Sequence, residues 1–316
     1  MPESPIIIAT RGSALALAQA NFIFDQCRVT FPRLSFEIQI FKTTGDKLQT
    51  ASLAQAGQSL PKGLFTKELE VALVRQKADI AVHSLKDLPT ELPTGLTLGA
   101  ATKREDVRDV LIYKTDDGHN GPIPQLAAGA RVATSSTRRQ AQLAAARPDL
   151  QLEEIRGNVP TRLEKLAESD ELAGTILAAA GLNRLHFSIN ADGTLEGDAV
   201  PAGIRAVALD TELMLPCVGQ AAIGLEIRED DGRIAKITER LNHFNTFAAV
   251  TAERAFLRGM GGGCQSPVGA HAVIEGTTIR MQAVSFLNDT VQRTEQSGAL
   301  REPESLGQAV AEALRA

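Results

Sequence analysis

The segment Ile8-Ala9-Thr10-Arg11-Gly12-Ser13 is typical of a junction between a short apolar strand and a helix. A second junction of this kind is Val132-Ala133-Thr134-Ser135-Ser136-Thr137-Arg138-Arg139. Each junction offers hydroxyl groups, arginine and the unpaired N–H groups of a helix start. Ligands of open α/β sheets bind at this carboxyl edge of the strands. A single junction of this kind also fits an ordinary N-cap. The repetition predicts two similar domains that face each other across an anion-binding cleft.

Apolar periodicity in the rest of the chain divides it into three units. The first has expected strands at 5–10, 34–42, 80–82 and 96–100 and helices at 14–29 and 66–75. The second has expected strands at 110–113, 131–133, 150–155 and 174–178 and helices at 136–146 and 159–167. The third has a helix at 248–258, strands at 270–274, 279–284 and 290–294, and a closing helix. This alternation predicts an α/β protein with mainly parallel strands.

Composition limits the classes of function. With 316 residues, 43% of them hydrophobic, the chain is long enough for two or three domains. A formal net charge of −5 argues against a general nucleic-acid binder. We expect neither a membrane span nor a signal or transit peptide, since no apolar run is long enough and residues 1–10 lack a basic start. Three widely spaced cysteines argue against disulfides and a zinc site and favour the cytoplasm.

Arginine is concentrated in the second unit. Residues 131–184 contain seven arginines and only one lysine. A guanidinium fork matches carboxylate and phosphate groups, so the bias suggests recognition of defined anions. Arg156-Gly157-Asn158 suits a strand-to-helix turn, which lets Arg156 and Arg162 bracket one helix start. The alternative for any one arginine is a solvated or salt-bridged surface position, because seven acidic residues share the stretch.

Two other segments carry candidate chemistry. Lys86 and Asp87 follow an apolar strand, where they can hold an anion and a developing cation; the alternative is a surface turn. Cys264 lies in Gly261-Gly262-Gly263-Cys264-Gln265-Ser266-Pro267, whose glycines leave room for a large group on the thiol. The alternative for Cys264 is a small buried residue. His83 is better explained as a satisfied, half-buried histidine than as a site residue.

Six segments, in this order, resemble the porphobilinogen deaminase family, whose members are also called hydroxymethylbilane synthases. They are residues 9–13 with 15–17 and Gln19, then 62–70, 78–87, 134–140, 156–159 and 262–265, so the resemblance extends over nearly the whole chain. It implies two lobes like those of a type II periplasmic binding protein, with mixed, mainly parallel sheets, and a smaller α+β C-terminal domain. The expected boundaries are 1–103 with about 205–228 for the first lobe, 104–204 for the second, and 229–316 for the cofactor-carrying C-terminal domain.

The resemblance also implies the activity. The family is a group of transferases that join four porphobilinogen molecules head to tail, release ammonia and yield hydroxymethylbilane, in tetrapyrrole and haem biosynthesis. A dipyrromethane cofactor primes the chain through a thioether to one cysteine, here Cys264. We expect a cytoplasmic monomer that binds no metal, nucleic acid or membrane.

Residue roles follow from the same resemblance. The expected catalytic residues are Asp87 and Lys86. The expected cofactor-binding residues are Cys264, Lys86, Asp87, Ser135, Ser136, Arg138 and Arg139. The expected substrate-binding residues are Arg11, Ser13, Gln19, Thr134, Arg156, Arg162 and Arg184.

Chemistry inferred from the residues agrees with this assignment. Each pyrrole unit carries an acetate and a propionate, so a growing chain needs many forked donors. A carboxylate such as Asp87 can stabilise the cation left when ammonia departs. Two alternatives stay open: a non-catalytic two-lobed anion-binding protein, and a thiol enzyme, for which His271 is poorly placed as a base.

The departures of the chain from the family pattern include the segment before Lys62 and the residue at position 221. Ser59-Leu60-Pro61 precedes Lys62 where glycines are common, in a longer loop over 45–62. Ala221 follows Gly219-Gln220 where glycine is usual, and we expect it to tighten that turn slightly.

Overall fold

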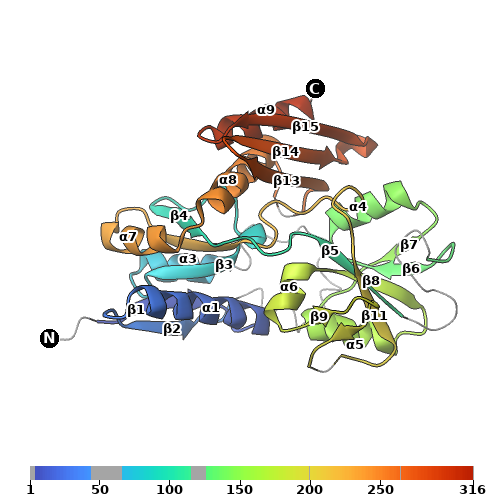
Figure 1. Cartoon of the computed structure of the whole chain (residues 1–316), viewed down its shortest axis with the longest axis horizontal. Coiled ribbons are helices and arrows are strands. Elements are labelled where there is room, and N and C mark those ends of the chain that lie inside the picture. The colour runs from blue at the N-terminus through green and yellow to red at the C-terminus, as the bar shows by residue number, and fades with distance from the viewer. Residues whose placement is uncertain (1–3, 44–65, 115–125, 199, 264, 316) are drawn as a thin grey trace.

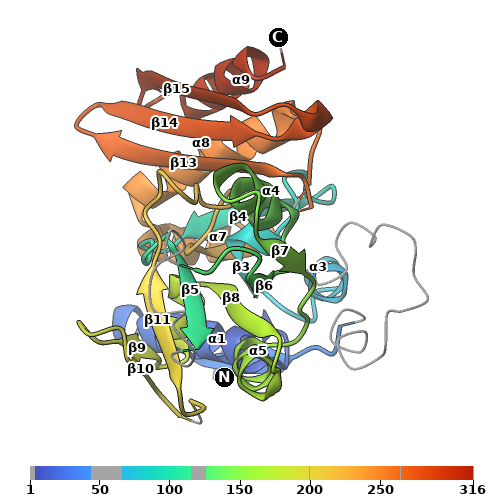
Figure 2. The same cartoon turned by 90° about the vertical axis from the view of Figure 1, so that its right-hand side faces the viewer.

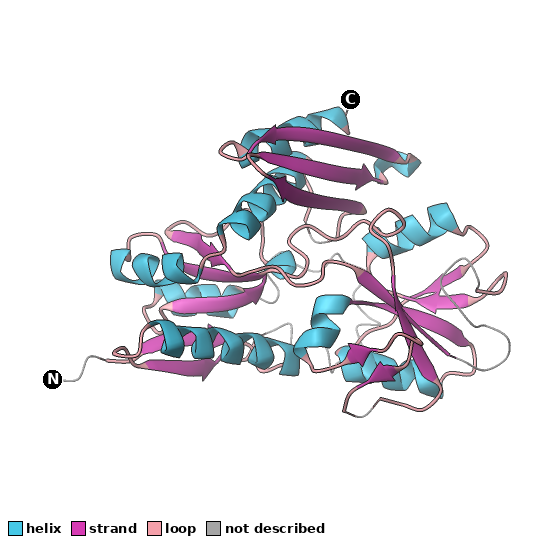
Figure 3. Cartoon of the chain, in the orientation of Figure 1, coloured by secondary structure: helices cyan, strands magenta, loops and turns pink. Residues whose placement is uncertain are grey.

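Two sheets of the same topology form most of the protein. The computed structural model describes residues 4–43, 66–114, 126–198, 200–263 and 265–315. The first sheet has the order β2-β1-β3-β12-β4 and the second β7-β6-β8-β5-β11. In each, the first three strands are parallel and the fourth is antiparallel to both neighbours. Figures 1 and 3 show the sheets side by side in two lobes, which confirms the predicted fold class.

The first lobe buries both faces of its sheet. Its strands are β1 (Ile6–Thr10), β2 (Phe36–Ile40), β3 (Ile80–Ser84), β4 (Leu96–Ala101) and β12 (Ile223–Arg228), and its helices are α1 (Ala14–Thr30), α3 (Lys67–Val74) and α7 (Gly232–Leu241). Neighbouring strand residues point to opposite faces. Ile8 accordingly packs in one core with residues of α1 and α7, whereas Ala9 packs in another with residues of α3.

The second lobe repeats this arrangement. Its strands are β5 (Asp109–Lys114), β6 (Arg131–Ala133), β7 (Gln151–Glu153), β8 (Leu172–Ala178) and β11 (Ile204–Ala208), and its helices are α4 (Thr137–Ala146), α5 (Val159–Glu168) and α6 (Ala179–Arg184). A small hairpin, β9 (Ser188–Ile189) and β10 (Leu195–Glu196), lies beside it. Leu143 of α4 packs on one face, while Leu163 of α5 and Leu182 of α6 pack on the other.

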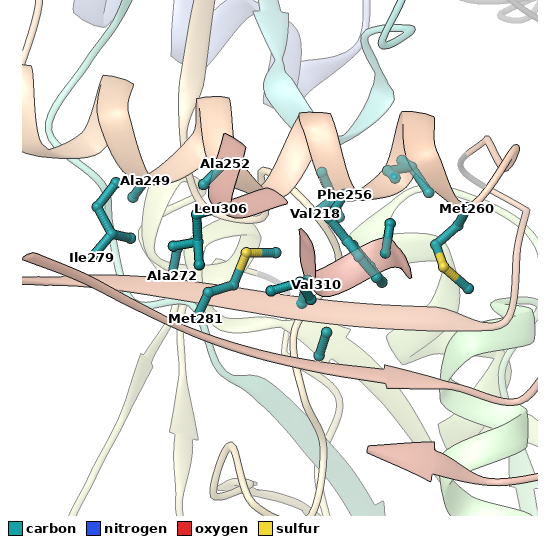
Figure 4. Close-up of a cluster of buried hydrophobic side chains, with 14 of the residues drawn as sticks. Val218, Ala249, Ala252, Phe256, Met260, Ala272, Ile279, Met281, Leu306 and Val310 are labelled. Carbon is teal, nitrogen blue, oxygen red and sulfur yellow. The ribbon is translucent and has the colours of Figure 1, made fainter. Parts of the chain in front are cut away.

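The C-terminal unit is a separate α+β layer. It consists of α8 (Phe244–Gly259), the antiparallel strands β13 (Val268–Glu275), β14 (Thr278–Ser285) and β15 (Gln292–Ala299), the short turn η3 (Leu287–Asp289), and α9 (Pro303–Ala313). Figure 4 shows Phe256 of α8, Met281 of β14 and Val310 of α9 in its core. Phe256 and Val310 are both fully buried.

Two crossovers, residues 102–108 and 209–222, join the lobes, and a buried glutamate on α8 holds both. Glu253 Oε1 accepts hydrogen bonds from Arg104 Nη1 at 2.7 Å and Ala272 N at 2.9 Å. Its Oε2 accepts from Arg104 Nη2 at 3.0 Å and Gly219 N at 2.8 Å. Arg104 belongs to the first crossover, Gly219 to the second and Ala272 to β13. One carboxylate therefore connects both crossovers to the C-terminal unit.

The domain boundaries stay a prediction, for which the strand pairing suggests adjusted limits. β11 pairs with β5 in the second sheet, and α7 shares the core of the first lobe. We therefore propose that the second lobe extends through Ala208 and that the C-terminal domain begins near Phe244. Among the described residues, no helix is long and apolar enough to cross a bilayer.

Candidate functional site

Lys86 and Asp87 lie together in a tight turn at the carboxyl end of β3. The turn is the 3-10 element η1 (Leu85–Asp87), in which Leu85 is buried, Lys86 half-buried and Asp87 exposed. Leu85 N donates to Ala222 O of the second crossover at 3.0 Å. The predicted position of the pair after an apolar strand is confirmed.

Charged groups of both lobes act on Lys86. Burial lowers the pKa of its ammonium group, and Arg139 lowers it further, whereas Asp87, Cys217 and Asp109 raise it. Arg139 and Asp109 belong to the second lobe, and Cys217 belongs to the second crossover. Gly219 of this crossover lies against the backbone of Leu85 and Lys86, and Gln220 donates to Asp109 Oδ1 at 3.0 Å, so the crossover connects the turn to the second lobe.

Arg138 and Arg139 form a buried cluster with Asp109. Arg138 donates to Asp109 Oδ2 at 2.7 Å and to Leu215 O at 2.6 Å. Arg139 donates to Asp109 Oδ1 at 2.7 Å and to Ile176 O at 2.9 Å. Burial would raise the pKa of Asp109, but the two guanidinium groups hold it well below its usual range. The sequence did not single out Asp109.

The cluster has a net positive charge and unused donors. Two guanidinium groups face one carboxylate, and in the described part of the chain neither arginine Nε has a hydrogen-bond partner. A buried charge or N–H group without a partner is costly, so the cluster suits a further anionic group. A pyrrole carboxylate is such a group, and the donor set therefore fits the cofactor implied by the sequence.

The hydroxyl groups of both junctions shape the backbone. Ser13 caps α1 by accepting from Ala16 N at 3.3 Å, and Ser136 caps α4 by accepting from Arg139 N at 3.5 Å. Ser135 Oγ donates to Ile155 O and accepts from Ile155 N, at 2.8 and 3.1 Å. The buried Thr134 accepts from Ser136 N at 3.3 Å. The N-cap interpretation is thus confirmed for both junctions, while their ligand role stays a prediction.

Gln19 of α1 contacts the end of β3, and Arg11 lies just before α1. Gln19 is buried, and its amide exchanges hydrogen bonds with Ser84 Oγ at 2.8 and 3.1 Å. Since Ser84 ends β3, Gln19 fixes the strand directly before the turn that holds Lys86 and Asp87. Arg11 is half-buried in the link between β1 and α1.

The remaining predicted arginines occupy different surroundings. Arg162 donates to Gly157 O at 2.9 Å; burial, together with Arg139 and Arg156, lowers its pKa to about 10. Arg156 is exposed and pairs with Glu154 at 3.1 Å. Arg162 therefore lies in the field of the buried cluster, and Arg156 lies toward solvent.

Arg184 contacts the second crossover. It ends α6 and donates from Nη2 to Ala221 O at 2.5 Å. Burial lowers its pKa to about 10, although Glu105 raises it. Arg184 therefore links the second lobe to the crossover in this conformation.

Cys264 and the loop at 45–62 lie outside the described residues, but the neighbours of Cys264 are placed. Thr137 Oγ1, in the first turn of α4, donates to Gln265 O at 2.6 Å. Figures 1 and 2 show α4 beneath the C-terminal sheet. The residue after Cys264 therefore touches the helix start that carries Arg138 and Arg139.

Sequence reasoning missed Arg254. This buried residue of α8 donates to Leu88 O at 3.0 Å and to Pro89 O at 2.6 Å, directly after the turn η1. Its only sequence signal is the pair Glu253-Arg254 within an apolar helix. His83, in contrast, is buried and paired with Glu226 at 2.8 Å, as expected of a satisfied histidine.

Comparison with known proteins agrees with this geometry. Residues 6–236 match the model of the porphobilinogen deaminase, dipyromethane cofactor binding domain, and residues 247–316 match that of the porphobilinogen deaminase, C-terminal domain. The chain is 45% identical to porphobilinogen deaminase of Moorella thermoacetica, over 98% of this chain and 93% of that protein. It is 44% identical to porphobilinogen deaminase of Trichlorobacter lovleyi, over 100% of this chain and 95% of that protein.

Solved structures align more loosely. The aliphatic sulphonate binding protein SsuA of Escherichia coli aligns at a TM-score of 0.42 and 12% identity, over 81% of this chain and 70% of that one. The family is established by the domain matches and full-length relatives: the chain belongs to the porphobilinogen deaminase family.

Proposed function

We propose that this protein is a hydroxymethylbilane synthase, a transferase that joins four porphobilinogen molecules head to tail with release of ammonia. One arrangement carries the proposal. The charges of Arg139 and Asp109 in the buried arginine cluster act on Lys86, and the residue after Cys264 contacts the helix that bears this cluster. This placement supports the proposal that Lys86 and Asp87 act together with the arginine cluster and the cofactor-carrying cysteine.

The cofactor would be held from both lobes. Cys264 would supply the thioether, and Lys86 would bind one pyrrole carboxylate. Another would bind the Nε–H groups of Arg138 and Arg139, which have no hydrogen-bond partner among the described residues. When bound, dipyrromethane supplies the terminal pyrrole carbon to which the first substrate unit is added. Ser135 and Ser136 keep the arginine-bearing junction in shape through their backbone hydrogen bonds.

Asp87 would act on the substrate itself. Loss of ammonia from the aminomethyl group leaves a delocalised cation, and a carboxylate nearby stabilises that charge. Asp87 is exposed and belongs to a turn whose neighbours are hydrogen-bonded, so it can meet substrate without rearrangement of the strand. The same carboxylate can hold pyrrole N–H groups and assist proton transfer.

The outer arginines would bind the acetate and propionate groups of the substrate and of the growing chain. They are Arg11, Arg156, Arg162 and Arg184. Ser13, Gln19 and Thr134 belong to the same proposed substrate set, but their side chains already bond to protein groups. We propose that these three act by shaping the site. We further propose a monomer in the cytoplasm that binds neither nucleic acid nor membrane.

Intact-protein mass spectrometry tests the proposal. The purified wild-type chain is expected to exceed its sequence mass by one dipyrromethane adduct, and Cys264→Ser is expected to lack it. Asp87→Asn is expected to keep the adduct and lose about 100-fold or more of its turnover, since an oriented electrostatic contact in the transition state is removed. An unmodified mass in active enzyme would refute the proposal, and near-normal turnover of Asp87→Asn would remove Asp87 from the mechanism.

A further inference from the structure

Arg254 holds the segment that follows the catalytic turn. It lies in the middle of α8, its side chain is buried, and its two terminal nitrogens reach two successive carbonyl groups, Leu88 O and Pro89 O. Leu88 is itself buried. Two backbone acceptors offset the cost of burying a guanidinium group, and that group satisfies the carbonyl of the buried Leu88.

The other side of the turn is fixed independently. Gln19 bonds to Ser84, and Leu85 N donates to Ala222 O at 3.0 Å. With Arg254 on Leu88 and Pro89, the backbone is fixed immediately before and immediately after the turn. Only Lys86 and Asp87 lie between the fixed points.

We propose that Arg254 is a positioning residue for the reaction: it sets the orientation of the Lys86–Asp87 turn from the C-terminal domain. The inference rests on the proposed function. Arg254 touches neither substrate nor cofactor in this role and acts through the backbone of Leu88 and Pro89. Its guanidinium suits the task because a planar fork reaches two adjacent carbonyl groups at once, which a lysine ammonium group does less well.

The position of Arg254 gives the contact a second consequence. α8 ends at Gly259, shortly before the glycine-rich segment that contains Cys264. The same helix therefore ends close in sequence to the proposed cofactor attachment point and, through Arg254, binds the backbone directly after the catalytic turn. The contact ties the placement of Asp87 to the domain that carries the growing chain.

Kinetics of cofactor-loaded enzyme test the proposal with Arg254→Met, Arg254→Lys and a matched control, Arg258→Met. Arg258 lies one helical turn further along α8 and is exposed. Its contact with Thr90 O of the same segment is long, at 3.4 Å. Because small displacements of catalytic groups are costly, we expect Arg254→Met to lower kcat about 10- to 100-fold with KM changed less than about threefold. Arg254→Lys is expected to lie between this variant and wild type, and Arg258→Met close to wild type.

Amide hydrogen exchange of the peptide 85–90 supplies the second readout. Exchange is expected to accelerate there in Arg254→Met and, less strongly, in Arg254→Lys, and to stay unchanged in Arg258→Met. A lower melting temperature with normal kcat per loaded molecule would show a merely structural role and overturn the proposal. So would unchanged exchange at 85–90.

Two further outcomes are decided by the same data. If Arg254→Met does not fold, the kcat and exchange of Arg254→Lys decide the proposal, with wild-type values overturning it. If the wild-type chain carries no dipyrromethane adduct, the proposed function fails, and the catalytic part of this inference is overturned with it. The exchange comparison then still reports whether Arg254 holds the turn.

Discussion

At the scale of single residues, Ala221 stands out because it adopts a backbone conformation that favours glycine. Its φ is +71°, close to the +70° of Gly219 in the same crossover. An L-residue in this region costs about 1 kcal/mol or more relative to its preferred conformations. The carbonyl group of Ala221 accepts hydrogen bonds from Arg184 and from Glu105 N, so the surrounding contacts hold the strained residue in place.

Replacing Ala221 by glycine is therefore expected to stabilise the protein. We predict a gain of about 0.5–1 kcal/mol in the free energy of unfolding, measured by urea denaturation, because the loss of strain exceeds the entropy that glycine adds to the unfolded chain. Gly219→Ala is the matched control. There a Cβ would meet Leu85 at 3.2 Å and the φ is equally unfavourable, so this variant is expected to be destabilised. Destabilisation by Ala221→Gly would show that the conformation is not strained.

At the scale of elements, predictions succeeded where the signal is local. The helix expected at 14–29 is Ala14–Thr30, and the strand expected at 131–133 is Arg131–Ala133. The sequence did not yield β12 (Ile223–Arg228) as a strand, because its partners β3 and β4 come from the first third of the chain. Its residues alone do not show which sheet they complete.

Residues of the candidate site were likewise predictable only where the local sequence carries a motif. Lys86, Asp87 and the arginines are recognisable because each lies in a motif beside a strand or helix end. Asp109 and Arg254 were missed because their roles depend on partners far along the chain, a pair of guanidinium groups in one case and two backbone carbonyl groups in the other. Local sequence shows only a charge before an apolar strand at Asp109 and a charge within an apolar helix at Arg254.

The proposed role of Lys86 in the turn η1 predicts a loss of activity at alkaline pH. Burial lowers the pKa of Lys86 below its ordinary value of 10.5, so the ammonium group loses its proton at a lower pH than an exposed lysine does. If Lys86 binds carboxylates as proposed, this binding weakens as the pH rises through that folded-state value. We predict that kcat/KM declines on the alkaline side below pH 10.5 and that Lys86→Arg, which stays charged, shifts this decline upward. An unshifted decline would assign it to another group.

At the scale of the whole molecule, the cluster around Asp109 joins parts that are distant in sequence. Asp109 begins β5, Arg138 and Arg139 belong to α4, and Gln220 of the second crossover also donates to Asp109 Oδ1 at 3.0 Å. The cluster therefore holds the second lobe against the crossover that returns to the first. We therefore expect loss of the cluster to lower the free energy of unfolding of the protein.

Asp109→Asn is predicted to lower the free energy of unfolding at neutral pH by about 3 kcal/mol, since it leaves two buried guanidinium groups without their counter-charge. The pKa of Asp109 is depressed in the folded state, so its contribution is present above the ordinary value of 3.8 and is lost as the pH falls below it. The wild type should therefore lose more stability than the variant between pH 5 and pH 3, measured by urea titrations at each pH. Asp149→Asn, which removes an exposed pair with Arg147, serves as the control and should behave like wild type. Equal stability of Asp109→Asn and wild type at pH 7 would contradict the prediction.

The position of β12 between β3 and β4 has a consequence for the order in which the nascent chain can fold. All five strands of the second sheet have been synthesised once the ribosome reaches Ala208. The first sheet lacks its fourth strand until Arg228 has been made, although its other strands are the earliest in the chain. During synthesis the N-terminal lobe must wait for the lobe that follows it, with the edges of β3 and β4 unpaired. The second lobe can therefore complete its sheet before the first lobe does, because β12 of the first sheet is synthesised after β11 of the second.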